Sequence, residues 1–394
     1  MTAVAASAAA SVPTTDWRVE TIHDEAGLRA LAAEWDGLFA RMARPSPFLA
    51  YTWVETWQRH FGRESRLWVL ALRDSGGALI GLAPLHVVSR RIAGALPLRS
   101  VEFLGYRGSS VCADHLDFLA PAEQREAVAR ALIAELLRRA AEWDALVLAG
   151  LAADSPIPEL WRELSPGGTA VRPEDICYHR DLPADISTLW TEIKRHHPKL
   201  ASNVKYYRKR LQQQKSVEFI APVPADQVQA TLQALVQLHT QAHARKGQSG
   251  NFFRPDYLGF HSDLLGSLAA DPRLYLARLD CDGAPTAILY GFLCGGVLYY
   301  YQSGFDPALG SFGVGTLLLA SVFEDAIARL GAREFDFLRG AEEYKSRWTA
   351  DARWTREFRA WQRTLAGRLS ALEYRARRRA AAFRDRRKAA AAHA

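Results

Sequence analysis

Residues 297–345 read VLYYYQSGFDPALGSFGVGTLLLASVFEDAIARLGAREFDFLRGAEEYK, and this stretch decides the fold that we expect. The pattern predicts a strand at 297–303, a glycine-rich turn, a helix that begins near Val314 and a strand at 333–338. The first turn of a helix carries unpaired N–H groups and the positive end of its dipole, and glycines let a phosphate approach them. The stretch therefore favours a pyrophosphate cradle. A tight turn that lets the helix pack closely is the alternative.

Two common phosphate-binding motifs are excluded here. No Gly-Lys-Ser/Thr follows the glycines, and the dinucleotide fingerprint G-x-G-x-x-G is missing. Residues 283–305 carry no charge and are numerous enough to cross a bilayer. However, Gly295 and Gly296 interrupt them between runs of Val, Leu and Tyr, which predicts two buried strands joined by a turn.

Both halves of the chain show the same order of elements, namely helices, antiparallel strands, a helix and a strand. In the first half we expect helices at 26–42 and 50–60, a hairpin of strands 67–73 and 78–88, and a strand at 115–119. The fold class is therefore α+β, with two tandem units built from mostly antiparallel sheets flanked by helices. We expect a disordered leader (1–15), an N-terminal unit (16–153), a linker (154–173), a C-terminal unit (174–362) and a basic tail (363–394).

Composition indicates a globular protein, because 49% of the 394 residues are apolar and 24% are charged. The four cysteines are far apart, which suits neither a zinc site nor a dense disulfide framework and favours a reduced cytosol. Residues 1–15 lack the features of a secretion signal. The net charge of +7 is concentrated at one end: residues 356–394 hold 12 Lys+Arg and 3 Asp+Glu, so residues 1–355 carry −2.

Several phrases resemble a known family. They are PFLAYTWVETW (47–57), LIGLAPL (79–85), VEFLG (101–105), LYYYQSGFDPA (298–308) and FDFLRGAEEYKSRW (335–348). Together with the strand–turn–helix–strand order, they resemble the acyl-CoA N-acyltransferase (GNAT) superfamily. Within it they are similar to the two-domain, CelD-like branch associated with cellulose biosynthesis and hence with exopolysaccharide. That branch is related to the Fem-type aminoacyl transferases, which also pair two such domains.

The resemblance implies a donor site for acetyl-CoA or another acyl-CoA in the second unit. It places the pyrophosphate over Gly313, Val314, Gly315 and Thr316, with Gln302 and Ser303 on the preceding strand. One position departs from the family, because Gly310 stands where a Gln or Arg is common. Tyr344 matches the tyrosine that often protonates the leaving thiolate in this superfamily, and Lys345 would hold a phosphate or a carboxylate.

Acidic residues are the candidates for the base that acyl transfer to an amine requires. Glu342 follows a strand end, with solvated surface acids as the alternative for it and Glu343. Asp336 alternates with Phe335 and Phe337, so we expect it on the opposite face of the sheet, as a base or paired with Arg339.

The candidate acceptor-site residues are His239, Arg245, Asp306 and Asp114. Asp114, His115 and Asp117 belong to the first unit, which lacks a glycine cradle and would shape the acceptor groove; a network that stabilises the loop is the alternative. His239 and His243 lack a third ligand nearby, so we expect no metal.

Residues 194–215 carry eight cations and no acid, so this segment could form a solvated helix face or contact phosphates. We expect the protein in the cytoplasm, where the basic tail could touch an anionic inner membrane face. The favoured hypothesis is an N-acyltransferase that acts on an amine of a small molecule or of a lipid- or sugar-linked precursor. The alternatives are a Fem-type transferase that uses aminoacyl-tRNA, the one nucleic acid expected, and a non-enzymatic scaffold of a polysaccharide synthase.

Overall fold

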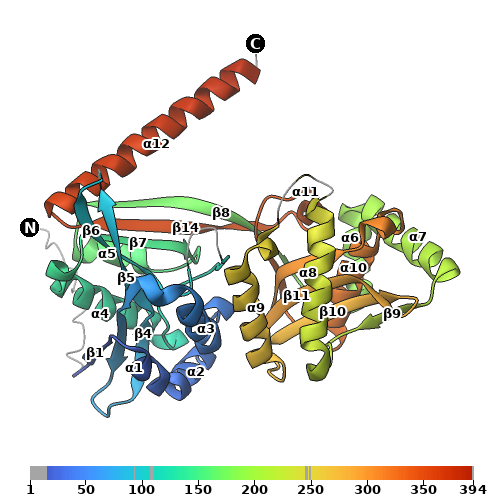
Figure 1. Cartoon of the computed structure of the whole chain (residues 1–394), viewed down its shortest axis with the longest axis horizontal. Helices are drawn as coiled ribbons and strands as arrows, with labels where there is room; N and C mark the ends of the chain where they lie inside the picture. The colour runs from blue at the N-terminus through green and yellow to red at the C-terminus, as the bar shows by residue number, and fades with distance from the viewer. Residues whose placement is uncertain (1–15, 93, 107–110, 245–246, 248–249, 393–394) are drawn as a thin grey trace, which may run out of the picture.

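The N-terminal half of this computed structural model packs helices against two sheets (Figure 1). The structure describes residues 16–92, 94–106, 111–244, 247 and 250–392. The predicted disordered leader therefore lies outside the described residues. The elements are β1 (Arg18–Ile22), α1 (Glu25–Ala30), α2 (Ala32–Ala40), α3 (Tyr51–Phe61), β2 (Ser65–Leu67), β3 (Val69–Arg73), β4 (Leu79–Ala83), β5 (Leu85–Ile92), β6 (Leu96–Phe103), α4 (Arg125–Arg138), β7 (Ala145–Leu151) and α5 (Ile157–Leu164).

The C-terminal half carries the glycine-rich turn. Its elements are β8 (Thr169–Asp181), α6 (Ile186–His196), α7 (Pro198–Gln214), β9 (Val217–Ile220), α8 (Val228–Ala244), α9 (Pro255–Leu268), β10 (Leu274–Cys281), β11 (Ala284–Cys294), β12 (Val297–Phe305), α10 (Val314–Ala328), β13 (Glu334–Arg339), α11 (Glu343–Ser346), β14 (Ala352–Trp361) and α12 (Leu365–Ala392). The predicted α+β class is confirmed.

One sheet runs through both halves. Within the described residues it has 11 strands in the order β2-β5-β6-β7-β14-β8-β13-β12-β11-β10-β9, beside a 3-stranded sheet β1-β3-β4. β14 comes from the end of the chain yet lies between β7 and β8, antiparallel to both. The long strands β8 and β14 therefore join the halves along one edge of the molecule (Figure 1).

Helices cover the two faces of the C-terminal part of the sheet separately. α8 contacts β11 and β12 on one face, whereas α10 contacts the same strands from the other face and packs against α7. Phe335 and Phe337 of β13 belong to the core under α10, together with Leu317 and Val322 of that helix. The core on the α8 face continues into the N-terminal half, because Trp53 and Phe292 belong to the same cluster.

Several predicted elements differ from the structure. Residues 283–305 do form a hairpin, with Gly295 and Gly296 at positive φ in its turn. The predicted strand at 78–88 breaks at Pro84, where the chain passes from the small sheet to the large one. Residues 115–119 contribute isolated bridges rather than a strand. The interval predicted as a linker, 154–173, contains α5 and the start of β8. None of the described helices is both long and apolar enough to cross a membrane.

Candidate functional site

Two parallel strands separate at the centre of the candidate site. β12 pairs with β13 through Val297, Leu298 and Tyr299. In the described strands, the last of these pairs joins Tyr299 to Asp336. Just beyond this point β12 is bulged, because Tyr290 of β11 faces Gln302 whereas the adjacent Gly291 faces Tyr300. A bulge re-aims the side chains of its strand. Tyr300 belongs to the core on the α10 face, whereas Tyr301 packs on the α8 face and the next residue, Gln302, neighbours Tyr257 on that same face.

The glycine-rich turn leads from β12 into α10. Asp306 begins a short 3-10 turn (Pro307–Phe312), where its side chain accepts a hydrogen bond from the Ala308 N–H. Gly313 then adopts a left-handed conformation at φ 64° and precedes the first residue of α10. A Cβ at Gly313 would lie 2.3 Å from the ring of Tyr207, whereas one at Gly310 would meet nothing within 4 Å. The turn is therefore closed by α7 at Gly313 and open at Gly310.

A cavity of about 750 Å³ lies over this turn. It extends between α7, the start of α10 and α11. The lining includes His197, Pro198, Lys199, Leu200, Asn203, Tyr207, Tyr300, Ser303, Gly304, Phe305, Gly310, Gly313, Val314, Gly315, Thr316, Glu343, Tyr344 and Arg347. Six of the residues predicted for the donor site or its chemistry thus meet in one cavity: Ser303, Gly313, Val314, Gly315, Thr316 and Tyr344. We call it the donor cavity below.

Three hydroxyl groups form a chain at the inner end of the donor cavity. The hydroxyl of Tyr300 hydrogen-bonds to the Ser303 hydroxyl, and Tyr344 interacts with Tyr300. Burial raises the pKa of Tyr344 far above its usual value, and the neighbouring Tyr300 adds to this rise. Burial also raises the pKa of Tyr300. Tyr344 is therefore a neutral phenol at physiological pH that carries the proton a donor needs, and burial makes it a weaker acid than an exposed tyrosine.

Lys345 occupies a structural position rather than the predicted substrate-binding one. It is 2% exposed, and its Nζ donates to the carbonyl oxygen of Arg339 at 2.6 Å. The same ammonium pairs with a carboxylate oxygen of Glu342 at 2.9 Å. Lys345 does not line the donor cavity because it faces the end of β13. Glu342 is half exposed, and its charge contributes to the raised pKa of Tyr344.

Asp336 joins the two halves and does not reach the donor cavity. Its side chain points away from Phe335 and Phe337, as predicted, but it is fully buried there. One oxygen pairs with His115 Nε2 at 3.0 Å and Arg353 at 2.6 Å, and the other accepts from the Leu338 N–H at 2.7 Å. The prediction that Asp336 acts as a base does not fit this enclosure.

Asp114 also belongs to the junction between the halves. It is fully buried, and its carboxylate accepts from the backbone N–H of Arg339 at 3.0 Å and from the guanidinium Nε at 2.8 Å. Asp117 is held in a similar way by Arg125 at 2.7 Å. These contacts match the alternative interpretation, in which the first-half acids stabilise a loop, and Asp114 does not line the donor cavity.

Two further predicted residues, Gln302 and His239, do not line the donor cavity. Gln302 accepts from the Ser303 N–H and neighbours Tyr257 on the α8 face. His239 of α8 packs on the ring of His243 with centroids 4.2 Å apart, and burial followed by His243 lowers the pKa of His239 to about 4. The predicted acceptor residue Arg245 lies outside the described residues.

Sequence reasoning missed three polar residues that line the donor cavity. His197 lies at the break between α6 and α7, where burial and the nearby Arg180 lower its pKa. The others are Asn203 of α7 and Arg347, which follows α11 and pairs with Glu343. The dipeptide His197-Pro198 could have indicated this site. Proline favours the first turn of a helix, so Pro198 predicts that the basic segment forms two helices with His197 between them.

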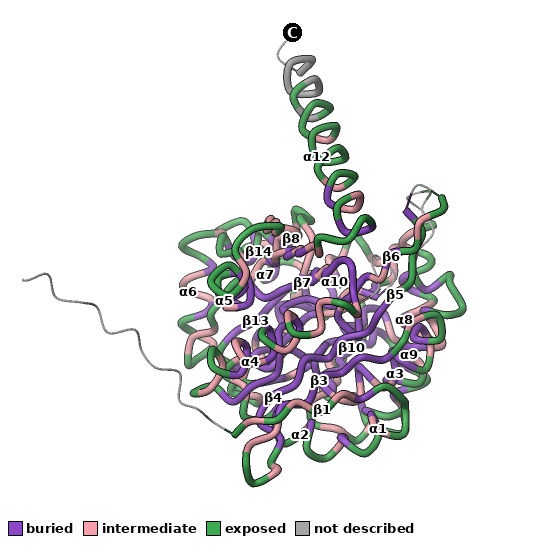
Figure 2. Tube along the Cα trace, turned by 90° about the vertical axis from the view of Figure 1, so that its left-hand side faces the viewer, coloured by how far each residue is buried: buried purple, intermediate pink, exposed green. Residues whose placement is uncertain are grey.

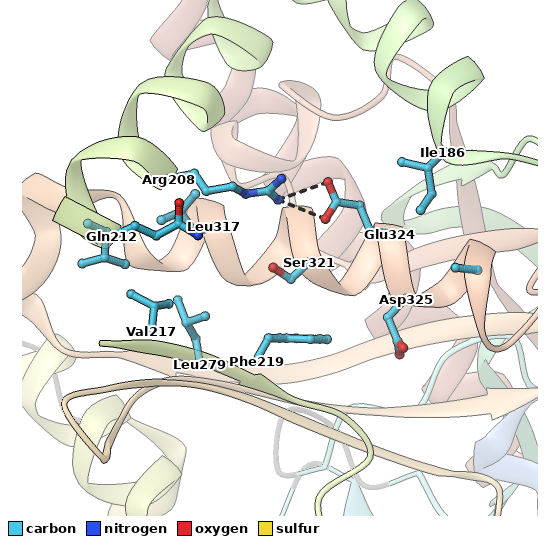
Figure 3. Close-up of a pocket in the computed structure, with 12 residues that line it drawn as sticks. Ile186, Arg208, Gln212, Val217, Phe219, Leu279, Leu317, Ser321, Glu324 and Asp325 are labelled. Carbon is cyan, nitrogen blue, oxygen red and sulfur yellow. Dashed lines mark hydrogen bonds and ion pairs between the residues drawn. The ribbon is translucent and has the colours of Figure 1, made fainter. Parts of the chain in front are cut away.

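Another cavity, of about 510 Å³, lies on the same face of the sheet between α7, α10 and β9 (Figure 3). An ion pair between Arg208 and Glu324 spans it at 3.0 Å. Elsewhere, ligand atoms of His179, Asp181 and Glu334 lie within 4.8 Å of one another. Glu334 is already paired with Arg44 and Arg353, whose charges compete with any cation.

Comparison with known proteins identifies the unit that carries the donor cavity. A sequence model of the acetyltransferase (GNAT) domain matches residues 198–346. This part of the chain is a GNAT acetyltransferase domain. It begins with α7 and ends with α11, so the GNAT domain contains most of the donor cavity, including the glycine-rich turn and Tyr344. A search of curated proteins finds no match to the chain.

Solved structures extend the similarity of the fold beyond the GNAT domain. The crystal structure of FemX is 11% identical with a TM-score of 0.58, and the match covers 87% of this chain and 97% of FemX. A conserved protein of unknown function from Bacteroides thetaiotaomicron is 10% identical with a TM-score of 0.52, covering 88% of this chain and 100% of that one. Over the matched 87% of its length, the chain thus shares its fold with FemX. The assignment to the cellulose-associated branch stays a prediction.

Proposed function

We propose that this protein transfers an acyl group, such as acetyl, from an acyl-CoA to an amine, with the donor bound in the donor cavity. The acceptor class that we propose is an amine of a polysaccharide or lipid-linked precursor. The observation that carries the proposal is the coincidence of an open helix N-terminus, a cavity of about 750 Å³ and a neutral, buried tyrosine in one place. Cavities of this volume are typical of small-molecule sites.

The turn offers suitable groups for a pyrophosphate. The first N–H groups of α10 have no acceptor within their own helix, and Val314, Gly315 and Thr316 line the donor cavity there. The space beside Gly310 leaves this end of α10 accessible. Lys199 adds positive charge to the lining, whereas Arg347 is paired there with Glu343.

The chemistry assigns roles to two side chains. The amine nitrogen attacks the thioester carbonyl carbon, the new C–N bond forms and the C–S bond breaks. His197, whose pKa is lowered by burial, is neutral near pH 7 and accepts the proton that the nitrogen loses, directly or through water. Tyr344 gives its proton to the departing thiolate and regains one from solvent along the Tyr300–Ser303 hydroxyl chain.

Isothermal titration of the full chain with acetyl-CoA and longer acyl-CoAs tests the donor assignment. We expect the Gly310→Glu variant to bind about 10- to 100-fold more weakly, because a carboxylate within several ångströms of a pyrophosphate costs roughly 1–3 kcal/mol. Gly37→Glu is the matched control, since Gly37 also has open space around it but lies on α2 of the other half. If the wild-type chain binds no acyl-CoA, the proposal is wrong.

A second function is favoured by the cations of α6 and α7. A cavity of about 760 Å³ beside these two helices is lined by Lys194, Lys205, Arg208 and Lys209, with no acid among its lining residues. It also shares Pro198 with the donor cavity. These cations suit a larger anionic donor such as aminoacyl-tRNA. Co-purified tRNA together with absent acyl-CoA binding would favour this Fem-type function.

A further inference from the structure

The C-terminal helix α12 extends from the body of the protein as a rod (Figures 1 and 2). It spans Leu365–Ala392, and 1.5 Å per residue makes it about 40 Å long. Its first turns rest on the body, whereas the later described residues are exposed (Figure 2). The helix therefore presents a long surface whose chemistry can be examined separately from the donor cavity.

Small residues attach α12 to the body. Ala366 is buried against Leu98 and Ala145, and Ala371 is 9% exposed. Ser370 accepts a hydrogen bond from the indole of Trp361. Leu369 is partly buried against the same cluster.

Large apolar side chains lie on the opposite side of α12. Leu365 is 65% exposed, Leu372 58% and Phe383 62%. At 100° per residue, these three residues, together with Ala376, fall within an arc of about 40° on the helix surface. Exposed apolar residues scattered singly need no explanation, but a stripe along one helix face marks an interaction surface.

Arginines border this apolar stripe. Arg368, Arg375, Arg379 and Arg386 fall along one edge of the stripe by the same helical geometry, and Arg377 and Arg384 lie beyond the other edge. Among the described side chains of α12, Glu373 is the acidic one, and it pairs with Arg377. A helix with an apolar face between rows of cations is typical of segments that lie at the surface of an anionic bilayer.

We propose that α12 binds anionic lipid bilayers, with Leu365, Leu372 and Phe383 entering the headgroup region and the arginines contacting lipid phosphates. A second copy of this chain is a poorer partner, because antiparallel or parallel pairing along the stripe would bring two rows of arginines together. A nucleic acid would be bound by the arginines alone and would leave the large apolar side chains in water. The proposal goes beyond acyl transfer and does not depend on it.

Co-sedimentation of the full chain with vesicles tests this inference. One set of vesicles contains phosphatidylcholine alone, and the other also contains about 30% of the anionic lipid phosphatidylglycerol. We expect binding to the anionic vesicles, weakened by salt, and little binding to the neutral ones. The triple variant Arg377→Glu, Arg378→Glu, Arg379→Glu should reduce the partition coefficient about 100-fold or more.

A matched variant separates position from net charge. Lys194→Glu, Lys205→Glu, Lys209→Glu changes the charge of α6 and α7 together by the same amount and should leave vesicle binding unchanged. Replacing Leu372 and Phe383 by Gln should weaken binding about tenfold without changing the net charge. Equal losses for the α12 variant and the α6–α7 variant would overturn the inference, because binding would then follow net charge alone.

Three other results would also overturn it. One is the absence of binding to anionic vesicles at low salt while acyl-CoA still binds, an outcome that leaves the proposed function intact. Another is a stable dimer that does not bind vesicles and that Leu372→Gln dissociates, which would assign the stripe to a second copy. The third is binding to RNA or DNA in preference to vesicles, since the stripe would then have no role.

Discussion

Replacing Asp336 by Asn should destabilise the whole protein rather than remove a catalytic base. The carboxylate is fully buried and bonded to His115, Arg353 and the Leu338 N–H. An Asn can still accept from the backbone N–H, but it removes one of the two carboxylates beside Arg353 and leaves His115 without its ionic partner, while Glu334 stays paired with Arg353. Losing a buried polar partner costs roughly 1–3 kcal/mol. We therefore expect the free energy of unfolding to fall by about that amount at pH 7.

Equilibrium urea unfolding of Asp336→Asn checks this value. The control is Asp263→Asn on α9, whose half-exposed carboxylate pairs with His60 at 2.9 Å. Exposed ion pairs contribute less than about 1 kcal/mol, so the control should unfold close to wild type. An Asp336→Asn variant with wild-type stability and no acyl transfer would refute this reasoning and restore the role of a base.

The pH dependence of the same comparison gives an independent check. Burial by itself would raise the pKa of Asp336, but His115 and Arg353 outweigh it and hold the pKa well below the ordinary range. A group whose pKa is lowered on folding contributes stability above its unfolded pKa, near 4 for an Asp, and loses that contribution as the pH falls. The difference between wild type and Asp336→Asn should therefore shrink below about pH 4.

Three further predictions concern the turn, the phenol and the shared strand. Gly313→Ala should lower the free energy of unfolding by about 2 kcal/mol in urea melts, because the left-handed backbone disfavours a Cβ and Tyr207 occupies its place. Tyr344→Phe should lower kcat about 100-fold in a thiol-release assay while the Kd for acyl-CoA stays unchanged, since it removes one proton donor. Burial opposes ionisation of Glu357, but hydrogen bonds from two arginines outweigh it and lower its pKa to about 2. Stability from this carboxylate is therefore present above about pH 4.5 and lost towards pH 2, and Glu357→Gln should remove that dependence from acid-unfolding curves.

The strand–turn–helix–strand unit could be predicted from the sequence because its signals are local. The hydrophobic runs of β12 and α10 differ in period, and the glycines between them mark the turn. Tyr344 could be placed near the turn only through the family resemblance. His197 escaped the prediction because its role depends on a helix break that brings α7 over the start of α10.

The partners of buried polar residues could not be predicted in the same way. Asp336 pairs with His115, which lies more than 200 positions earlier in the chain. Nothing in the sequence around either residue indicates that the two side chains meet. Lys345 is buried against a carbonyl oxygen at the end of β13 and pairs with Glu342, partners that its charge alone did not indicate. In β14 the buried Phe358 and Ala360 alternate with the charged Glu357 and Arg359, and this alternation was a usable signal for a strand. The position of β14 beside β7 could not be predicted, because strand order depends on long-range pairing.

The glycines of the turn separate the two interpretations that the sequence left open. Gly313 matches the tight-turn interpretation, since its positive φ and the ring of Tyr207 both exclude a side chain. Gly310 has a different position, because the space around it is open and it lines the donor cavity. A side chain at position 310 would meet no steric barrier and would extend beside the start of α10. The departure from the family pattern at Gly310 thus removes a side-chain contact but leaves the backbone N–H groups of α10 accessible. A donor bound here would depend on those groups more than on side chains, which is why a carboxylate introduced at position 310 should weaken its binding so strongly.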